Sequence, residues 1–282
     1  IFLWLILFVI ALKKSEILNK YGKNICLALI VIQAVSLIIT SLNAIEEPWF
    51  KTKSLNDSNQ SSFSKEKNVL IIVLDAFQSD IFQEIIDENK NYKDIFTGFT
   101  YFKNATGGFP NTYPSVPLIL TGEYYDNSKP ILEFIKEEFL TTSIFKTLKS
   151  NSFETYVFER DKMTIFVDNT LIDNSEIKKD ISLGKSMQSI PSLFTQLSLK
   201  YSPNFLKGII VKSDQFEVNW KFVKEDIELL NNINETATTD SNSPMFKFIH
   251  LRGLHPPVVL NEKLAYEPLD SSRENYKKQA KG

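Results

Sequence analysis

One carboxylate of the chain stands where it could bind a metal. Asp75 directly follows Asn68–Leu74 (NVLIIVL), a continuous apolar run that is typical of a strand buried on both faces. Ligands of open α/β sheets bind beyond the carboxyl ends of the strands, and a carboxylate is a hard oxygen ligand for a divalent cation. An Asp in this position is equally typical of a helix N-cap, so position alone leaves both roles open.

A threonine that could act as a nucleophile lies in the segment Gly107–Gly122 (GGFPNTYPSVPLILTG). Two glycines and a proline predict an irregular loop, after which Pro114 and Ser115 can start a helix that Gly122 ends. Thr112 would then lie just ahead of a helix N-terminus, where backbone N–H groups favour a phosphate or sulfate group. A metal bound to its hydroxyl would make Thr112 a nucleophile. The alternative is a capping threonine in a tight turn.

The chain has only two histidines, and both lie in the segment HLRGLHPP that begins at His250. We expect a strand to end near Leu251, so that His255 emerges into a proline-restrained loop beside Arg252. An imidazole and a guanidinium there could contact anionic substrate oxygens. His250 lies inside the apolar strand and is predicted to be structural.

These segments need strands and helices that hold them in place. Apolar runs predict strands at Asn68–Leu74, Phe99–Phe102, Phe153–Phe158 and Phe246–Leu251. Amphipathic spacing or composition predicts helices within Ser79–Glu88, Thr141–Ser150, Met187–Leu206 and Asn219–Asn232. Strands that alternate with helices favour an α/β fold with a mixed or parallel sheet.

The composition excludes several classes of protein. Of the 282 residues, 43% are hydrophobic and 23% are charged, which allows a sizeable core and excludes disorder throughout. The net charge of −2 provides no basic field for a nucleic acid. A single cysteine, Cys26, excludes a disulfide framework and a Cys-rich zinc module.

Residues 1–45 are predicted to be a membrane region. Ile25–Leu42 is uncharged and long enough for a transmembrane helix, whereas Ile1–Leu12 is too short to span a bilayer. The shorter run indicates the end of a longer span or, alternatively, a lipid-facing or buried helix. Lysines dominate the charges of the loop 13–24, so the positive-inside rule places it in the cytoplasm and the residues after 43 outside. The polar segment 46–66 predicts a flexible tether, followed by an extracytoplasmic domain at 67–282.

Taken together, the three chemical segments resemble the alkaline phosphatase/sulfatase superfamily, especially its membrane-anchored lipoteichoic acid synthases and phosphoethanolamine transferases. NVLIIVLDAF resembles the family's first strand, which ends in an acidic metal ligand, here Asp75. NTYPSVPLILTG is similar to the nucleophile segment Cys/Ser-x-Pro-Ser-Arg-x-x-x-Leu-Thr-Gly, with Thr112 in the nucleophile position. FIHLRGLHPP is similar to a strand that leads to a substrate-binding histidine, here His255. The resemblance covers roughly Asn68 to the C-terminus, with a poorly matching middle from about residue 161 to 243.

The sequence also departs from the family pattern. Thr112 and Val116 stand where sulfatases have Cys or Ser and Arg, so the resemblance does not imply a formylglycine. Ala76 replaces a second Asp, as in the single-metal transferases. The later Asp-His-Gly motif, which completes the family's metal site, does not occur in these 282 residues. We expect a fragment whose domain is truncated at its C-terminus and inactive alone; the alternative is an incomplete site.

The resemblance implies an extracytoplasmic, membrane-anchored enzyme with one divalent metal, Mn, Mg, Zn or Ca, held by Asp75 and Thr112. Thr112 would attack a lipid or polyol phosphodiester and pass a phosphoglycerol or phosphoethanolamine group to a glycan or lipid hydroxyl. His255, together with Arg252, would bind substrate oxygens or transfer a proton. Two alternatives remain, a hydrolase of phosphodiesters or sulfate esters and a catalytically silent protein that binds a lipid or a partner and regulates the cell envelope.

Overall fold

The computed structural model describes residues 13, 15–46, 53–89, 91–159, 164–177 and 214–282. The chain divides into two compact units, Ile1–Thr52 and Lys53–Gly282. The predicted helix within Met187–Leu206 and the apolar run Ile1–Leu12 lie outside the described residues.

The first unit contains the helix α2, Ser15–Glu46, which includes the predicted transmembrane run Ile25–Leu42. The predicted loop 13–24 is wrong from Ser15 onward, because these residues form the first turns of α2. Lys, Leu and Glu favour helices, and a helix tolerates one glycine such as Gly22. Among the described residues, none of the helices meets the combined length and hydropathy that a membrane crossing needs.

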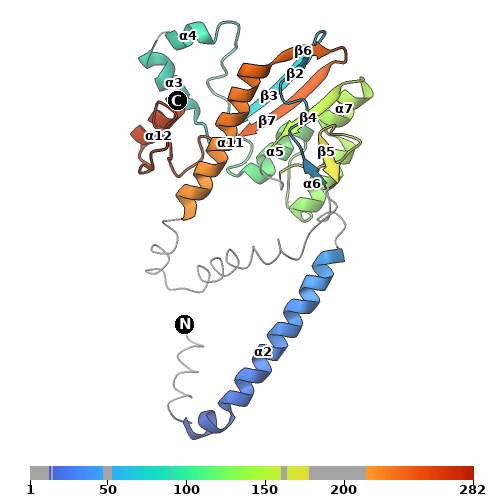
Figure 1. The fold of residues 1–282 in the computed structure, drawn as a ribbon, viewed down its shortest axis with the longest axis vertical. Helices are drawn as coiled ribbons and strands as arrows, with labels where there is room; N and C mark the ends of the chain where they lie inside the picture. Colours follow the sequence, from blue (N-terminus) through green and yellow to red (C-terminus); the bar gives the residue numbers. More distant parts are fainter. Residues whose placement is uncertain (1–12, 14, 47–52, 90, 160–163, 178–213) are drawn as a thin grey trace. The chain divides into compact units, whose positions relative to one another are not determined.

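The second unit is built on a parallel sheet of three strands in the order β3-β7-β4 (Figure 1). These strands are β3 at Asn68–Leu74, β7 at Met245–Leu251 and β4 at Glu154–Phe158. The strand predictions at these three places are confirmed to within one residue at each end. Every residue of β7 is buried, as expected for the central strand.

Strand β3 is buried on one face only, so the prediction of burial on both faces is wrong. Val69, Ile71 and Val73 pack against the main core, whereas Leu70, Ile72 and Leu74 are 42%, 51% and 43% exposed. β3 lies at the edge of the three-stranded sheet, with β7 as its hydrogen-bonded neighbour. Its second face therefore carries a row of exposed aliphatic side chains.

Helices pack against both faces of the sheet. α5 (Thr112–Thr121), α6 (Ile131–Thr141) and α7 (Ile144–Ser150) form the main core with one face of β7. α11 (Asp214–Thr236) packs on the other face through Leu229. The helix predicted at Thr141–Ser150 begins later, at Ile144, because Ser143 caps it by accepting from the backbone N–H of Lys146. The helix predicted at Asn219–Asn232 is confirmed within α11.

Two short pairs of strands show that the predicted tether is wrong from residue 53 onward. β1 (Lys53–Leu55) pairs with β5 (Ser175–Ile177), and β2 (Ser62–Ser64) pairs with β6 (Thr238–Ser241). The ammonium of Lys247 also donates hydrogen bonds to the backbone carbonyls of Asn59 and Gln60. The segment 53–66 is therefore part of the domain, because its polar backbone finds partners there; residues 47–52 of the predicted tether lie outside the described residues.

Near the carboxyl end of β3 lie α3 (Ser79–Glu88), α4 (Asn91–Ile95) and α12 (Arg273–Lys281). The prediction of a helix at Ser79–Glu88 is confirmed. The guanidinium of Arg273 contacts Asp80 and Glu84, and these hydrogen bonds hold the pKa of both carboxyls below their usual values. The predicted strand Phe99–Phe102 is wrong, because these residues form an exposed irregular segment.

Candidate functional site

Asp75 lies at the point where β3 leaves the sheet. Its backbone N–H donates to the carbonyl of Leu251 at 2.8 Å, so the carboxyl ends of β3 and β7 meet here. Ala76 follows with φ 62°, and the N-cap of α3 is Gln78. The alternative that Asp75 caps this helix is therefore wrong. Its side chain is only 16% exposed and is available to other groups of the site.

Thr112 is the first residue of α5, with Asn111 as N-cap, so the helix begins two residues before the predicted start at Pro114 and Thr112 lies within its first turn. Its Oγ1 lies 3.5 Å from each of the two carboxylate oxygens of Asp75. The loop before α5 packs closely, because a Cβ at Gly108 would stand 2.3 Å from Leu118 Cδ2. The fold thus brings together the hydroxyl and the carboxylate that the sequence singled out, from segments 37 residues apart.

His250 is part of the same site, although the sequence indicated only a structural role. Its side chain is 1% exposed, and its Nδ1 lies 2.6 Å from Oε2 of Glu159, which is equally buried. Its Nε2 faces Asp75 with 3.9 Å between Nε2 and Oδ2, and this nitrogen has no hydrogen-bond partner. Burial lowers the pKa of His250, but the hydrogen bond and charge of Glu159, aided by Asp75, outweigh it and raise the pKa overall.

Sequence reasoning missed Glu159 entirely. It directly follows β4, just as Asp75 directly follows β3, and the two strands lie on either side of β7. The sequence did contain a signal for Glu159, namely a charged residue directly after an apolar strand. Such residues at the carboxyl ends of parallel strands lie at the same edge of the sheet. What the sequence lacked was the strand order, which places the ends of β3, β7 and β4 side by side.

His255 and Arg252 lie in the loop that follows β7. Nδ1 of His255 is 2.7 Å from the carbonyl oxygen of Pro256, and the guanidinium of Arg252 lies 4.5 Å from the ring centre of Phe222. None of the contacts described for the two side chains joins them to Asp75 or Thr112. Their predicted roles toward substrate stay predictions.

The donor atoms suit a divalent cation. Asp75 and Thr112 offer hard oxygen ligands, and a spacing of 3.5 Å is too long for a good hydroxyl hydrogen bond but suits two ligands of one ion. Within the described residues, no group of three or more His, Cys, Asp or Glu side chains could hold a metal. The pair therefore fits part of a ligand shell.

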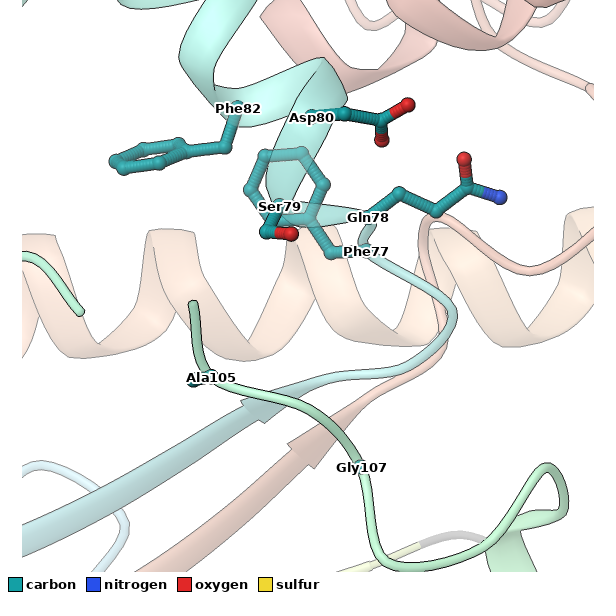
Figure 2. A pocket seen from close by; sticks show the side chains of 7 residues that line it. All are labelled: Phe77, Gln78, Ser79, Asp80, Phe82, Ala105 and Gly107. Carbon is teal, nitrogen blue, oxygen red and sulfur yellow. The ribbon is translucent and has the colours of Figure 1, made fainter. Parts of the chain in front are cut away.

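An open pocket of about 680 Å³ lies beyond the carboxyl ends of β3 and β7 (Figure 2). One wall is formed by residues 77–80 and Phe82 at the start of α3, and the other includes Ala105 and Gly107. The first wall begins two residues after Asp75 and the second ends five residues before Thr112. The segments that carry the two site residues thus also line a space that is large enough for a small ligand.

Neither the curated proteins nor the solved structures contain a significant match to this chain. The family model described as Sulfatase matches residues 67–280, which include β3, α5 and β7 with Asp75, Thr112 and both histidines. The mixed α/β architecture of Lys53–Gly282 agrees with such a domain. This chain belongs to the sulfatase family, in the alkaline phosphatase/sulfatase superfamily.

Proposed function

We propose that this chain is a membrane-anchored phospho-group transferase in which Thr112 is the nucleophile. One observation carries the proposal, namely the Thr112 hydroxyl held 3.5 Å from both oxygens of Asp75 at the carboxyl edge of the sheet. Threonine is not a precursor of the formylglycine on which sulfate-ester hydrolysis by sulfatases depends, so its presence favours phosphoryl chemistry. Family membership supports an enzyme of this superfamily in general.

The transfer takes place in two displacements. Oγ1 of Thr112 attacks the phosphorus of a phosphodiester, a new P–O bond forms, and the bond to the leaving alcohol breaks. The proton of Thr112 would pass to the leaving alcohol through His255, and Arg252 would contact the phosphoryl oxygens. An acceptor hydroxyl then attacks the phosphothreonine, the P–O bond to Thr112 breaks, and the acceptor's proton would return to Oγ1 through His255. A resident divalent metal, held by Asp75 and Thr112, would make the threonine oxygen a stronger nucleophile.

The donor and acceptor follow from the proposed location. The uncharged run Ile25–Leu42 supports a membrane anchor, and the lysines at 13–24 support an extracytoplasmic domain. A lipid carrying phosphoglycerol or phosphoethanolamine is then the donor, and a glycan or lipid hydroxyl of the envelope is the acceptor. The pocket beside residues 77–82 is open enough to admit such a head group.

The covalent intermediate tests the proposal. The chain, expressed within its full reading frame, is incubated with labelled lipid donors and a divalent metal, and intact-mass analysis measures the added phospho-group. We expect the label on the wild-type chain, a reduced yield in Thr112→Ser, and none in Thr112→Ala. Labelling that persists in Thr112→Ala contradicts the nucleophile. Release of the label to water at the same rate with and without an acceptor alcohol would identify a hydrolase instead.

A further inference from the structure

Three donor atoms at the edge of the sheet are spaced as ligands of one ion. Oγ1 of Thr112 lies 3.5 Å from both oxygens of Asp75, and Nε2 of His250 lies 3.9 Å from Oδ2 of Asp75. Both spacings exceed the 2.7–3.2 Å of good hydrogen bonds. Two atoms bound to one metal at roughly 2.0–2.2 Å lie roughly 3–4 Å apart, which matches these spacings.

The second observation is the unpartnered nitrogen of a buried ring. The side chain of His250 is 1% exposed, and its Nε2 is without a hydrogen-bond partner, although a buried polar atom nearly always has one. The other ring nitrogen, Nδ1, lies 2.6 Å from the carboxylate of Glu159. Metal-binding histidines have this arrangement, because a carboxylate that accepts the N–H of one ring nitrogen leaves the lone pair of the other for the metal.

The carboxylate of Asp75 lies next to this open nitrogen. When the neutral ring donates its Nδ1–H to Glu159, the lone pair of Nε2 faces Oδ2 of Asp75, and the two electron-donating atoms repel each other. A cation between Nε2 and Oδ2 converts this repulsion into two favourable contacts. The oxygens of Asp75 and Thr112 already face the same space.

We propose that His250 is a nitrogen ligand of the metal held by Asp75 and Thr112, with Glu159 orienting the ring. This inference rests on the proposed function for the presence of the metal and adds the chemistry of the site. A mixed nitrogen and oxygen set favours a divalent transition metal over Mg²⁺ or Ca²⁺, which prefer oxygen ligands alone.

Pulsed electron paramagnetic resonance on the chain loaded with Mn²⁺ tests the assignment, because spin-echo modulation from imidazole nitrogen reports a histidine ligand. The chain has two histidines, so one substitution decides between them. We expect nitrogen modulation in the wild-type chain and in His255→Asn. Persistence in His255→Asn assigns the signal to His250 even if variants at position 250 fail to fold.

A variant at position 250 provides the complementary measurement. In His250→Asn the amide can replace Nδ1 toward Glu159, while the donor at Nε2 is lost. We expect no nitrogen modulation and a loss of Mn²⁺ affinity larger than the roughly 10- to 100-fold that removal of a hydrogen-bond partner behind a ligand causes. Excess Zn²⁺ should displace Mn²⁺ from the wild-type site far better than excess Mg²⁺.

Three results would overturn the assignment: Mn²⁺ bound without nitrogen modulation, modulation that disappears in His255→Asn, or no binding of Mn²⁺ at all. The first two results leave the proposed function intact when Thr112→Ala still abolishes the phosphothreonine. Failure of that labelling experiment, with nitrogen modulation present, removes the transferase and leaves the metal site.

Discussion

Strand β7 buries two ionisable side chains, Lys247 and His250, which face opposite sides of the sheet. The ammonium of Lys247 donates to the carbonyls of Asn59 and Gln60 at 2.7 and 2.8 Å. These contacts come from the chain itself and hold the segment 53–66 against the domain. A buried charge needs hydrogen-bond partners to offset the loss of water, and the partners of Lys247 all come from the fold.

His250 lies three residues further along β7, and one of its two ring nitrogens has no partner in the fold. Glu159 satisfies its Nδ1, but its Nε2 faces Asp75 without a partner. A buried group whose partners all come from the fold contributes to structure, whereas a buried nitrogen that faces a carboxylate without a hydrogen bond can bind the proposed metal. The comparison predicts that variants on the Lys247 side change stability alone, and that variants on the His250 side change metal affinity.

The largest expected effect is the loss of Lys247. Lys247→Met keeps the length of the side chain and leaves the carbonyls of Asn59 and Gln60 without their donor, which should lower the free energy of unfolding by about 2–3 kcal/mol. Denaturant unfolding measures the change, with Mn²⁺ affinity measured in parallel. A matching loss of metal affinity would contradict the contrast between the two faces of β7.

The next effect concerns Glu159. Glu159→Gln preserves the shape of the side chain but lets the ring of His250 adopt the other tautomer, so Mn²⁺ affinity should fall by about 10- to 100-fold. Isothermal titration of the wild-type and variant chains measures it. Glu154→Gln is a matched control on the same strand, because its carboxylate contacts Tyr156 instead of the histidine. Equal losses in both variants would contradict a specific role for Glu159.

Short sequence patterns predicted the strands and helices on which the site residues lie. The apolar runs of β3 and β7, the amphipathic spacing of α3, and the glycine and prolines around α5 depend on neighbouring residues, and all are found. Asp75 and Thr112 could be singled out because each stands at the end of such an element. Their approach to 3.5 Å depends on the path of the chain through α3 and α4, which lie between β3 and α5, and no local pattern encodes it.

The errors concern features that depend on distant partners. The segment 53–66 has a polar composition typical of a tether, but its backbone pairs with β5 and β6, more than a hundred residues away. Phe99–Phe102 has strand-forming side chains, yet the structure provides no strand beside it among the described residues. The partnership of His250 and Glu159, 91 residues apart, requires the order β3-β7-β4, which no local pattern encodes.

A pH dependence distinguishes the two buried side chains further. Burial lowers the pKa of Lys247 to about 8, with the charge of Asp240 opposing the shift. Between pH 8 and 10 the unfolded chain holds a proton on this lysine that the folded chain loses, so stability should rise with pH, by about 1–2 kcal/mol. Tyr156 opposes a small part of this rise near pH 10, because burial raises the pKa of its folded hydroxyl above the ordinary value of 10.0, so the unfolded chain loses that proton first.

The measurement is denaturant unfolding at pH 8 and pH 10, in the wild-type chain and in Lys247→Met. The rise should be absent from the variant, which has no ammonium at this position. A rise of the same size in Lys247→Met would assign the pH dependence to other groups and leave Lys247 charged throughout the range.

The smallest expected effect separates the backbone from the side chain at Asn59. Asn59 has φ 55°, and its amide donates to the hydroxyl of Tyr156 at 2.7 Å, while its carbonyl accepts from Lys247. Both Asn59→Ala and Asn59→Gly remove the amide, but only alanine adds left-handed strain, so unfolding should cost about 1 kcal/mol less in Asn59→Ala than in Asn59→Gly. Both variants keep the carbonyl and should therefore keep the rise in stability between pH 8 and 10. If either variant loses that rise, the side chain of Asn59, and not its backbone, determines the environment of Lys247.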